Sequence, residues 1–375
     1  MFKKSIKLFN LLGFEVKIDL SWIILAALIT WSLSTGYFPF EYKNLSIPTY
    51  WFMGLTGALA LFLSIIAHEL SHSIVAKKYG IPMKGITLFI FGGVAEMSEE
   101  PVSPKAEFVM AIVGPISSLA IALILYVIYR ISEGIIPIPV LGVIHYLAWI
   151  NGILAVFNML PAFPLDGGRV LRSFLWHWKN NLQTATRITT KIGAGFGIIL
   201  IILGVFNIFS SNFIGGMWWV LIGMFLYSAA TMSYRQLLVQ KALEGEPVDR
   251  FMKTDPITVS PSISLEELVS DYVYQHHYKM FPVVENDKLI GCVTTRHIKE
   301  VSRENWTQTK VGDITEQCGV DNTIPPGTDT VKALKTLHQT GSSRLMVVEG
   351  KDKLVGIISL KDIMNWLSFK MNLKE

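Results

Sequence analysis

The sequence predicts a polytopic α-helical membrane protein with about six transmembrane helices and a re-entrant β-hairpin, followed by a cytoplasmic α/β half. Three observations lead to this fold class. Hydrophobic residues make up 51% of the 375 residues and charged residues 17%, against about 25% charged residues in soluble domains. The apolar excess is concentrated before about Met232, whereas the rest has an ordinary globular composition. The polar half also repeats itself, which indicates two copies of one module.

The charge and cysteine patterns exclude several classes of protein. The net charge is only +4, and basic residues are scattered at the ends of apolar runs, unlike the clustered charge of a nucleic-acid-binding protein. Cys292 and Cys318 have no spacing typical of a metal site or a disulfide, which suits a reducing compartment. Glu15, Lys17 and Asp19 interrupt the first apolar residues and no signal-peptide cleavage site follows, so we expect a retained cytoplasmic arm.

Six apolar stretches are long enough to cross a bilayer, because a hydrocarbon core of about 30 Å needs about 20 helical residues. They run over Leu20–Phe38, Met53–Ala76, Ala106–Tyr129, Val140–Leu160, Ile192–Phe209 and Phe213–Met232. Most Lys and Arg residues near the ends of these stretches fall on one side of the membrane, while Lys43 and Arg130 fall on the other. By the positive-inside rule, we expect the N-terminus and the polar half in the cytoplasm.

A short segment between the second and third apolar stretches predicts a β-hairpin. Ile86–Ser98 is too short to span, is rich in β-branched and aromatic residues, and carries Gly92-Gly93 as a turn signal. Unpaired backbone at membrane depth is tolerated only where protein or a water-filled cavity covers it. We therefore expect a re-entrant hairpin that lines an interior site.

The second apolar stretch contains the motif HELSH, His68 to His72. Histidines four residues apart lie on one face of a helix, where they can hold a single Zn²⁺, and Glu69 is placed to act as a general base. A chance HExxH in a chain of this length has a probability of about 1%. Ionisable residues inside a membrane span are costly and usually functional. The helical rise puts His68, nine residues before Lys77, about 13 Å inside the cytoplasmic boundary.

A catalytic zinc also needs a third protein ligand and an open position for water. The best candidate is Asp166, in the segment NMLPAFPLDGGR. Pro161 and Pro164 end the fourth apolar helix, and Gly167-Gly168 let the backbone turn tightly beside the carboxylate. Such a carboxylate is more often a turn or helix-end residue, but a HExxH motif that still lacks a ligand favours metal binding.

These motifs resemble the site-2 protease family of intramembrane zinc metalloproteases. The marks of that family are HExxH on one membrane helix and an N-x-x-P-x-x-P-x-D-G-G segment on a later one, and the resemblance covers the membrane half. It implies that His68, His72 and Asp166 are the zinc ligands and that Glu69 is the catalytic base. It also implies that Asn158 lies near the active centre, beside the substrate or the developing oxyanion; capping of the broken helix is the alternative.

Two further segments look like the same family. They are the GGV of the hairpin and Gly114-Pro115, which the family often follows with an asparagine where this chain has Ser118. The implied reaction is hydrolysis, in which zinc polarises the scissile carbonyl and Glu69 moves the proton from water to the leaving amine. A helical substrate must unwind first, and we expect the hairpin near Phe89 to Val94 to receive the extended segment by strand addition.

The polar half repeats with a constant offset. Val259-Ser260-Pro261 aligns with Ile324-Pro325-Pro326, and the segment GCVTTRHI aligns with GIISLKDI, each 65 residues later. Each copy predicts a short β-like segment, a helix, two strands and a closing helix. The expected helices are Leu265 to Gln275 and Thr330 to Gln339, and the expected strands are FPVV and LIGCVTT in the first copy and LMVV and LVGIIS in the second.

The duplicated unit resembles the CBS domain over roughly Phe251 to Leu367. Pairs of such domains bind adenine nucleotides in the cleft between them, with the pattern G-x-x-[ST]-x-x-D near the phosphate and ribose. The resemblance implies that Ser359 and Asp362 of the second copy, and Thr294 of the first, contact ATP, ADP or AMP. His297 replaces the aspartate in the first copy. The alternative for Asp362 is a helix-start carboxylate that interacts with the helix dipole.

The predicted organisation is a transmembrane zinc protease domain over residues 1–240 and CBS domains over 241–310 and 311–375. The expected partners are a membrane-spanning protein substrate, the lipid bilayer, an adenine nucleotide and a second copy of the chain through the CBS domains. Two other functions stay open, namely a CBS-regulated metal transporter or channel and an inactive family member that acts as a binding protein. Glu69 distinguishes the protease from the transporter or channel, because a transport site needs no base beside the metal.

Overall fold

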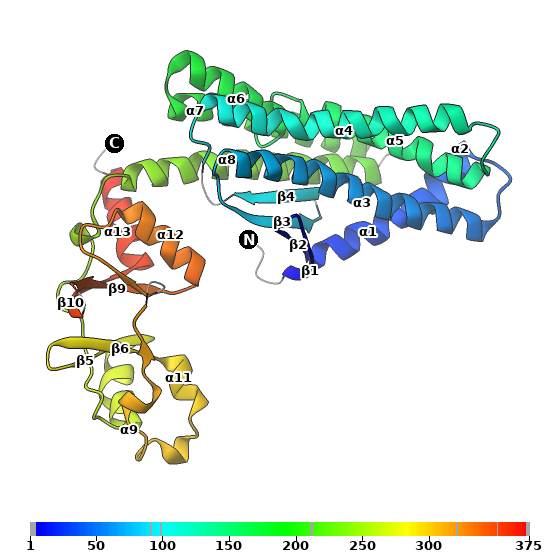
Figure 1. The fold of residues 1–375 in the computed structure, drawn as a ribbon. Helices are drawn as coiled ribbons and strands as arrows, with labels where there is room; N and C mark the ends of the chain where they lie inside the picture. The colour runs from blue at the N-terminus through cyan, green and yellow to red at the C-terminus, as the bar shows by residue number, and fades with distance from the viewer. Residues whose placement is uncertain are drawn as a thin grey trace. The chain divides into compact units, whose positions relative to one another are not determined.

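The computed structural model describes residues 5–90, 92–97, 100–210, 213–319, 322–350 and 352–372. The chain divides into two compact units, Met1–Arg235 and Gln236–Glu375. Figure 1 shows long helices around one sheet in the first unit and small sheets with short helices in the second. The predicted division at residues 240 and 310 stays a prediction.

Within the described residues, six helices are long and apolar enough to cross a membrane, as the sequence predicted. A shorter helix, α6 (Asp166–Lys179), lies between the fourth and fifth of them. The long helices are α1 (Leu20–Ser32), continued by a π-helix (Leu33–Tyr37) and α2 (Phe38–Glu41), then α3 (Ile47–Lys78), α4 (Pro104–Ser132), α5 (Ile138–Asn158), α7 (Leu182–Phe209) and α8 (Phe213–Leu243).

Several helices extend beyond the apolar stretches because polar residues cap and continue them. α3 begins before Met53, since the Ser46 side chain caps it by accepting a hydrogen bond from the Thr49 N–H at 3.4 Å. α7 begins about three turns before Ile192, with Asn181 as its cap. Hydropathy detects only the apolar part of such a helix, so the predicted starts were too late.

The predicted hairpin is present as β3 (Met83–Phe89) and β4 (Gly92–Met97). Phe89 pairs with Gly92, so the turn lies between these two residues and the prediction of Gly92-Gly93 as the turn is wrong. Gly92 has φ +125°, a conformation open to glycine, which lets β4 start directly after a short turn. Its re-entry into the membrane stays a prediction.

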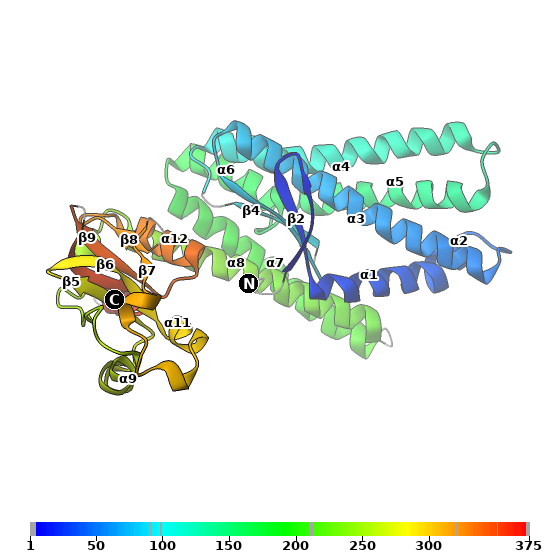
Figure 2. The ribbon, with the colours of Figure 1, turned by 60° about the horizontal axis from the view of Figure 1, so that its bottom comes forward.

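The hairpin belongs to a larger sheet that includes the N-terminal arm. Strands β1 (Ser5–Leu11) and β2 (Phe14–Asp19) pair antiparallel, and β2 pairs parallel to β3, which gives the order β1-β2-β3-β4 among the described residues. Val16 and Leu88 are buried against Ile66 of α3. The sheet is therefore fixed against α3, beside which it lies in Figure 2.

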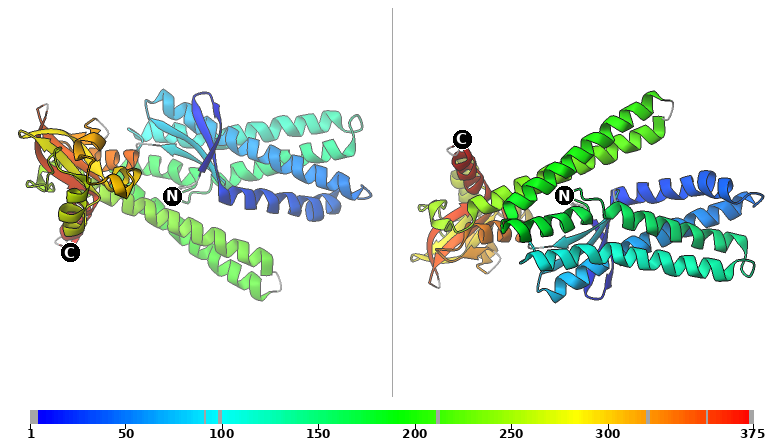
Figure 3. Two further views of the ribbon diagram at one scale, coloured as in Figure 1. Left: turned by 90° about the horizontal axis from the view of Figure 1, so that it is seen from below. Right: turned by 90° about the horizontal axis from the view of Figure 1, so that it is seen from above.

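Helices α7 and α8 run side by side (Figure 3) and touch through their backbones. A Cβ atom at Gly204 would lie 2.7 Å from the carbonyl oxygen of Gly216, and one at Gly197 would lie 2.7 Å from that of Gly223. Close approach through small residues is a common way for membrane helices to gain packing energy. The four glycines therefore hold α7 and α8 as one helical hairpin.

The second unit contains the two predicted copies. Their strand pairs are β5 (Met280–Glu285) with β6 (Lys288–Thr294) and β9 (Arg344–Glu349) with β10 (Lys353–Ser359), extended by β7 (Glu316–Gln317) and β8 (Thr323–Ile324). Their helices are α9 (Leu265–Glu267), a π-helix (Leu268–Val273), α10 (Tyr274–His276) and α11 (Thr295–Glu300), then α12 (Thr330–Thr340) and α13 (Leu360–Asn372). Short 3₁₀ helices cover Val248–Arg250, Arg303–Asn305 and Val311–Ile314.

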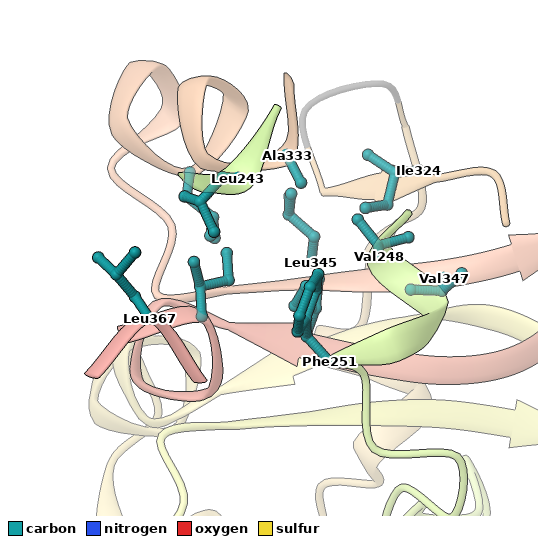
Figure 4. Close-up of a cluster of buried hydrophobic side chains, with 11 residues drawn as sticks. Leu243, Val248, Phe251, Ile324, Ala333, Leu345, Val347 and Leu367 are labelled. Atoms are coloured by element: carbon teal, nitrogen blue, oxygen red, sulfur yellow. The ribbon is translucent and has the colours of Figure 1, made fainter. Parts of the chain in front are cut away.

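The core of the second copy includes residues from the start of the unit (Figure 4). Leu243, Val248 and Phe251 are buried together with Leu345 and other residues of the second copy. The Lys253 N–H also donates to the Ile357 carbonyl oxygen at 2.8 Å. Residues at the start of the predicted first CBS domain thus pack in the core of the second copy.

Candidate metal centre

The three predicted metal ligands lie together. His68 and His72 are one turn apart on α3, and Asp166 is the first residue of α6. Asp166 Oδ2 lies 3.0 Å from His68 Nε2 and 3.3 Å from His72 Nε2, and the two Nε2 atoms are 3.2 Å apart. Among the described residues, these three form the group suited to hold a metal ion. Residues far apart in sequence therefore direct three ligand atoms at one point.

The spacing of the three atoms fits zinc. Zinc bonds of about 2.0–2.2 Å to nitrogen and oxygen give ligand-to-ligand distances of about 3.3–3.6 Å in a tetrahedron. The observed separations of 3.0 to 3.3 Å are slightly smaller, so an ion fits after a small outward shift of the side chains. Three protein ligands leave the fourth corner of the tetrahedron open, which is typical of a catalytic zinc site.

Helix α4 supplies the outer partners of both histidines. Ser118 Oγ lies 2.9 Å from His68 Nδ1, and the carbonyl oxygen of Met110 lies 2.5 Å from His72 Nδ1. Metal-binding histidines usually donate their second ring N–H to such an acceptor, which fixes the ring and its tautomer. With both Nδ1 atoms engaged, both Nε2 atoms face Asp166.

Gly114 makes this contact between α3 and α4 possible. It lies one helical turn from Met110 and one from Ser118, so all three residues share one face of α4. A Cβ atom at Gly114 would overlap His72 Nε2 and would lie 2.8 Å from His68 Nε2. The missing side chain therefore provides the space that the two imidazole rings occupy.

Two glycines let α6 begin directly at the metal centre. A Cβ atom at Gly167 would overlap the Met159 carbonyl at the end of α5, and one at Gly168 would overlap the Phe163 backbone nitrogen. Both glycines lie in the first turn of α6 and neither has a positive φ. They are thus required for close approach, not for the tight turn expected from the sequence. This packing sets the position of Asp166 relative to α5.

A buried ion pair joins α6 to α4. Arg172 is 4% exposed and its Nε donates to Glu107 Oε1 at 2.5 Å, while Glu107 is 1% exposed. The Arg172 guanidinium also donates to Glu100 and lies over the ring of Phe163, at 5.3 Å from its centroid. Breaking one side of a buried pair typically costs about 3–5 kcal/mol. The helix that begins with Asp166 is therefore firmly attached to α4.

The predicted base, Glu69, lies between the two histidines on α3 and faces strand β4. A Cβ atom at Gly93 of β4 would lie 2.9 Å from Glu69 Cγ and 3.0 Å from Ile65 Cγ2. The absence of a side chain at Gly93 thus lets the strand pass closely over this face of α3. The structure brings the predicted base, the predicted ligands and the edge strand of the sheet into one place.

Among the described residues, no hydrogen bond or ion pair joins Asn158 to this group. It is the last residue of α5, it is half-buried, and its side chain makes no hydrogen bond there. The residue that caps α5 is Met159, not Asn158. A role toward a substrate or oxyanion stays a prediction.

Thr294 and Ser359, two of the predicted nucleotide contacts, lie at the carboxyl ends of strands in the second unit, and the third, Asp362, lies in the first turn of α13. Thr294, at the end of β6, accepts from the His297 N–H at 3.4 Å at the start of α11. Ser359 ends β10, and its hydroxyl donates to Asp362 Oδ2 while it accepts from the Asp362 N–H. Helix capping, the alternative interpretation, is present, and nucleotide binding stays a prediction.

The cysteines of the second unit are packing residues in the described structure. Cys292 is buried beside Leu289, Met346 and Ile357, and Cys318 packs against the same group. Burial raises the pKa of the Cys292 thiol to about 11. A thiol that remains protonated is a poor nucleophile, which agrees with the structural role expected from the sequence.

Comparison with known proteins places this chain in a family. The model of peptidase family M50 matches residues 56–136 and 132–203, and that of the CBS domain matches residues 248–304 and 311–369. A protein of Synechocystis named as a candidate zinc metalloprotease is 34% identical, over 97% of this chain and 95% of its own. The chain belongs to peptidase family M50, the site-2 proteases.

Two proteins of Methanocaldococcus jannaschii are also similar to this chain, over different lengths. A zinc metalloprotease of Methanocaldococcus jannaschii is 31% identical over 99% of this chain and 98% of its own. The solved site-2 protease from Methanocaldococcus jannaschii is 29% identical with a TM-score of 0.43, and the match covers 61% of this chain and 94% of that one. The family models and the Synechocystis relative confirm the family predicted from HELSH and the Asp166 segment, and the CBS model confirms the tandem CBS domains.

Sequence reasoning missed the contributions of α4 to this M50 site. Ser118 was singled out only because the family often has asparagine there, and Glu107 and Arg172 were not singled out at all. The signal in the sequence was the charge of Glu107, since a carboxylate at an apolar stretch needs a partner of opposite charge. Their pairing across 65 residues, however, depends on which helices are neighbours.

Gly114→Ala should weaken metal binding at least about tenfold, because the added methyl group displaces the imidazole rings from their ligand positions. Gly152→Ala is the matched control, since a Cβ atom at this α5 glycine meets nothing within 4 Å. Zinc affinity of both purified full-length variants would be measured by competition with a chelator. Wild-type affinity in Gly114→Ala would contradict the described packing.

Proposed function

We propose that this chain is an intramembrane zinc metalloendopeptidase that cleaves transmembrane segments of membrane-bound protein substrates. The observation that carries the proposal is the meeting of His68, His72 and Asp166 within 3.3 Å of one another, with Glu69 between the two histidines. The helix that bears the motif, α3, has the length and apolarity to span a membrane. Membership of family M50 supports the same reaction.

Each residue has a distinct role in the proposed reaction. His68, His72 and Asp166 would hold the ion, which supplies a Lewis acid to polarise the scissile carbonyl and lower the pKa of water beside it. Glu69 would accept the proton of the attacking water and return a proton to the leaving amine. Asn158 would stabilise the developing oxyanion if substrate binding brings it closer to the ligands. The packed helices around the site would restrict entry of bulk water.

The proposed topology puts the N-terminus and the CBS domains in the cytoplasm. The excess of Lys and Arg on one side of the spans supports it. The metal centre then lies about 13 Å inside the cytoplasmic boundary by the helical rise. Glu69 argues against a metal transporter or channel, because transport needs no base beside the ligands, and the complete motif argues against an inactive binding protein.

Glu69→Gln should leave zinc bound and lower cleavage by about 10²- to 10⁴-fold, because it keeps the shape of the side chain but removes the base. Zinc content would be measured on the purified proteins, and substrate precursors would be identified as membrane proteins that accumulate in cells with the variant. Glu133→Gln, at the exposed Arg130–Glu133 pair, is the control. Loss of zinc from Glu69→Gln, or unchanged precursor levels, would contradict the assigned role.

We also propose that β4 holds the unwound substrate by strand addition. β4 lies at the edge of the sheet formed by the described strands and passes beside Glu69. An extended peptide paired with this edge would gain main-chain hydrogen bonds that replace those lost from its helix. The added strand would present its carbonyl groups close to the three ligands.

Proline substitutions in β4 provide a sharp test, because successive residues of a strand direct their N–H groups to opposite sides. One of the neighbours Val94 and Ala95 points its N–H toward β3, and the other points it toward the free edge. The edge-directed variant should lose cleavage while it keeps zinc and the wild-type melting temperature; the β3-directed variant should lose stability. Normal cleavage by both variants would rule out strand addition.

We further propose that the CBS pair binds an adenine nucleotide and regulates cleavage, with Thr294, Ser359 and Asp362 as contacts. The position of these residues at strand ends, next to helix N-termini, supports this role. Helix N-termini favour phosphate groups. A second copy of the chain is the proposed partner of the CBS pair, and the bound nucleotide would alter access to the metal centre.

Titration of ATP, ADP and AMP into the full-length protein should reveal saturable binding by at least one of them. Asp362→Asn should weaken that binding about tenfold or more, since a carboxylate can accept from both ribose hydroxyls and an amide cannot. The control is Asp271→Asn, at an exposed carboxylate. Light scattering in the same samples would report dimer formation. No binding of any of the three nucleotides would leave the CBS pair without this role.

A further inference from the structure

The two metal-binding histidines are held in different ways. His72 Nδ1 faces the main-chain carbonyl of Met110, an acceptor that no substitution of a side chain removes. His68 Nδ1 faces the hydroxyl of Ser118, at 2.9 Å. The His68 side chain is also the more buried, with 4% exposure against 12% for His72. The Nδ1 side of the His68 ring is therefore held by a single side chain of α4.

The tautomer of His68 decides whether it can hold a metal. Coordination through Nε2 requires a free lone pair on that atom, so the ring proton must be on Nδ1. A buried Nδ1–H needs an acceptor, and a hydroxyl oxygen can accept. The Ser118 side chain is fully buried, so solvent does not reach this hydrogen bond. Without this hydroxyl, the proton would be more stable on Nε2, beside Asp166, where it blocks the ligand atom.

We propose that Ser118 is a positioning residue that holds His68 in the metal-binding tautomer and orientation by accepting its Nδ1–H. The inference rests on the proposed zinc site and adds to it an outer residue, at the position where the family often has asparagine and where no role was assigned from the sequence. The hydroxyl lies on the far side of the ring from the three ligand atoms, so Ser118 acts through His68 and does not touch the ion or the substrate. Its effect is on metal affinity first, and on cleavage only as a result.

The neighbouring residue provides a matched control. Ser117 is on the same helix, but its hydroxyl donates to the Gly114 carbonyl oxygen at 2.7 Å, within α4 itself. Ser117→Ala and Ser118→Ala remove the same atom from adjacent positions. A general effect of serine removal on α4 would appear in both variants, whereas loss of the His68 partner would appear in one. Ser118→Thr keeps the hydroxyl and should restore the function that Ser118→Ala loses.

The test is a comparison of zinc affinity in the purified full-length proteins, by competition with a chelator of known affinity. Cobalt substitution gives a second readout, because its visible absorption reports the geometry of the ligands. Ser118→Ala should bind zinc about 10- to 100-fold more weakly than wild type, as expected for loss of an outer partner of a ligand. Ser117→Ala and Ser118→Thr should stay within about threefold of wild type. The melting temperature of the metal-free proteins should be equal, which separates positioning from folding.

Three results would overturn the inference. One is a zinc affinity of Ser118→Ala equal to that of Ser117→Ala. Another is a cobalt spectrum of Ser118→Ala identical to that of wild type together with unchanged affinity. The third is a lower melting temperature of the metal-free Ser118→Ala protein than of the metal-free wild type, which would show a packing role. Failure of wild type itself to bind zinc would instead reject the proposed function, so the two ideas fail in different experiments.

Discussion

The close contact between α3 and α4 at Gly114 is the constraint on which the metal centre depends. Two imidazole rings occupy the space that a side chain at this position would fill. Because the helices are this close, Met110 and Ser118, one turn to either side, reach the outer nitrogens of the same rings. A polar group in an apolar interior is stable only with a partner. Gly114 therefore provides the space for the two rings, and Met110 and Ser118 provide their hydrogen-bond partners.

The same helix also fixes the third ligand, by a different kind of interaction. Glu107 of α4 pairs with Arg172 of α6, and α6 begins with Asp166. Glycines at 167 and 168 hold the first turn of α6 against the end of α5. The carboxylate is thus positioned from both sides. Helix α4 thus contacts both histidines and the helix that carries Asp166, but supplies none of the three predicted ligands.

Sequence reasoning predicted the parts of this site that are encoded locally. The spacing of His68 and His72 on a helix determines that they share a face, and the proline and glycine residues around Asp166 mark a helix boundary. The outer partners depend on contacts between helices, so no local pattern identifies them. The N-terminal strands were missed for the same reason, because β2 finds its parallel partner β3 more than sixty residues later. The turn assigned to Gly92-Gly93 was wrong because a glycine pair can equally serve a strand that passes close to a helix, as Gly93 does at Glu69.

The separation of the ligands along the chain has a consequence for biosynthesis. His68 leaves the ribosome 98 residues before Asp166, and α4 lies between them in the order of synthesis. During that interval the nascent chain carries the two histidines without Asp166 and without the packed helix α4. The centre is complete only after α3, α4 and α6 have packed in the bilayer. The proposed hydrolytic activity therefore requires the packed helices and is absent from the nascent chain until α6 has been made.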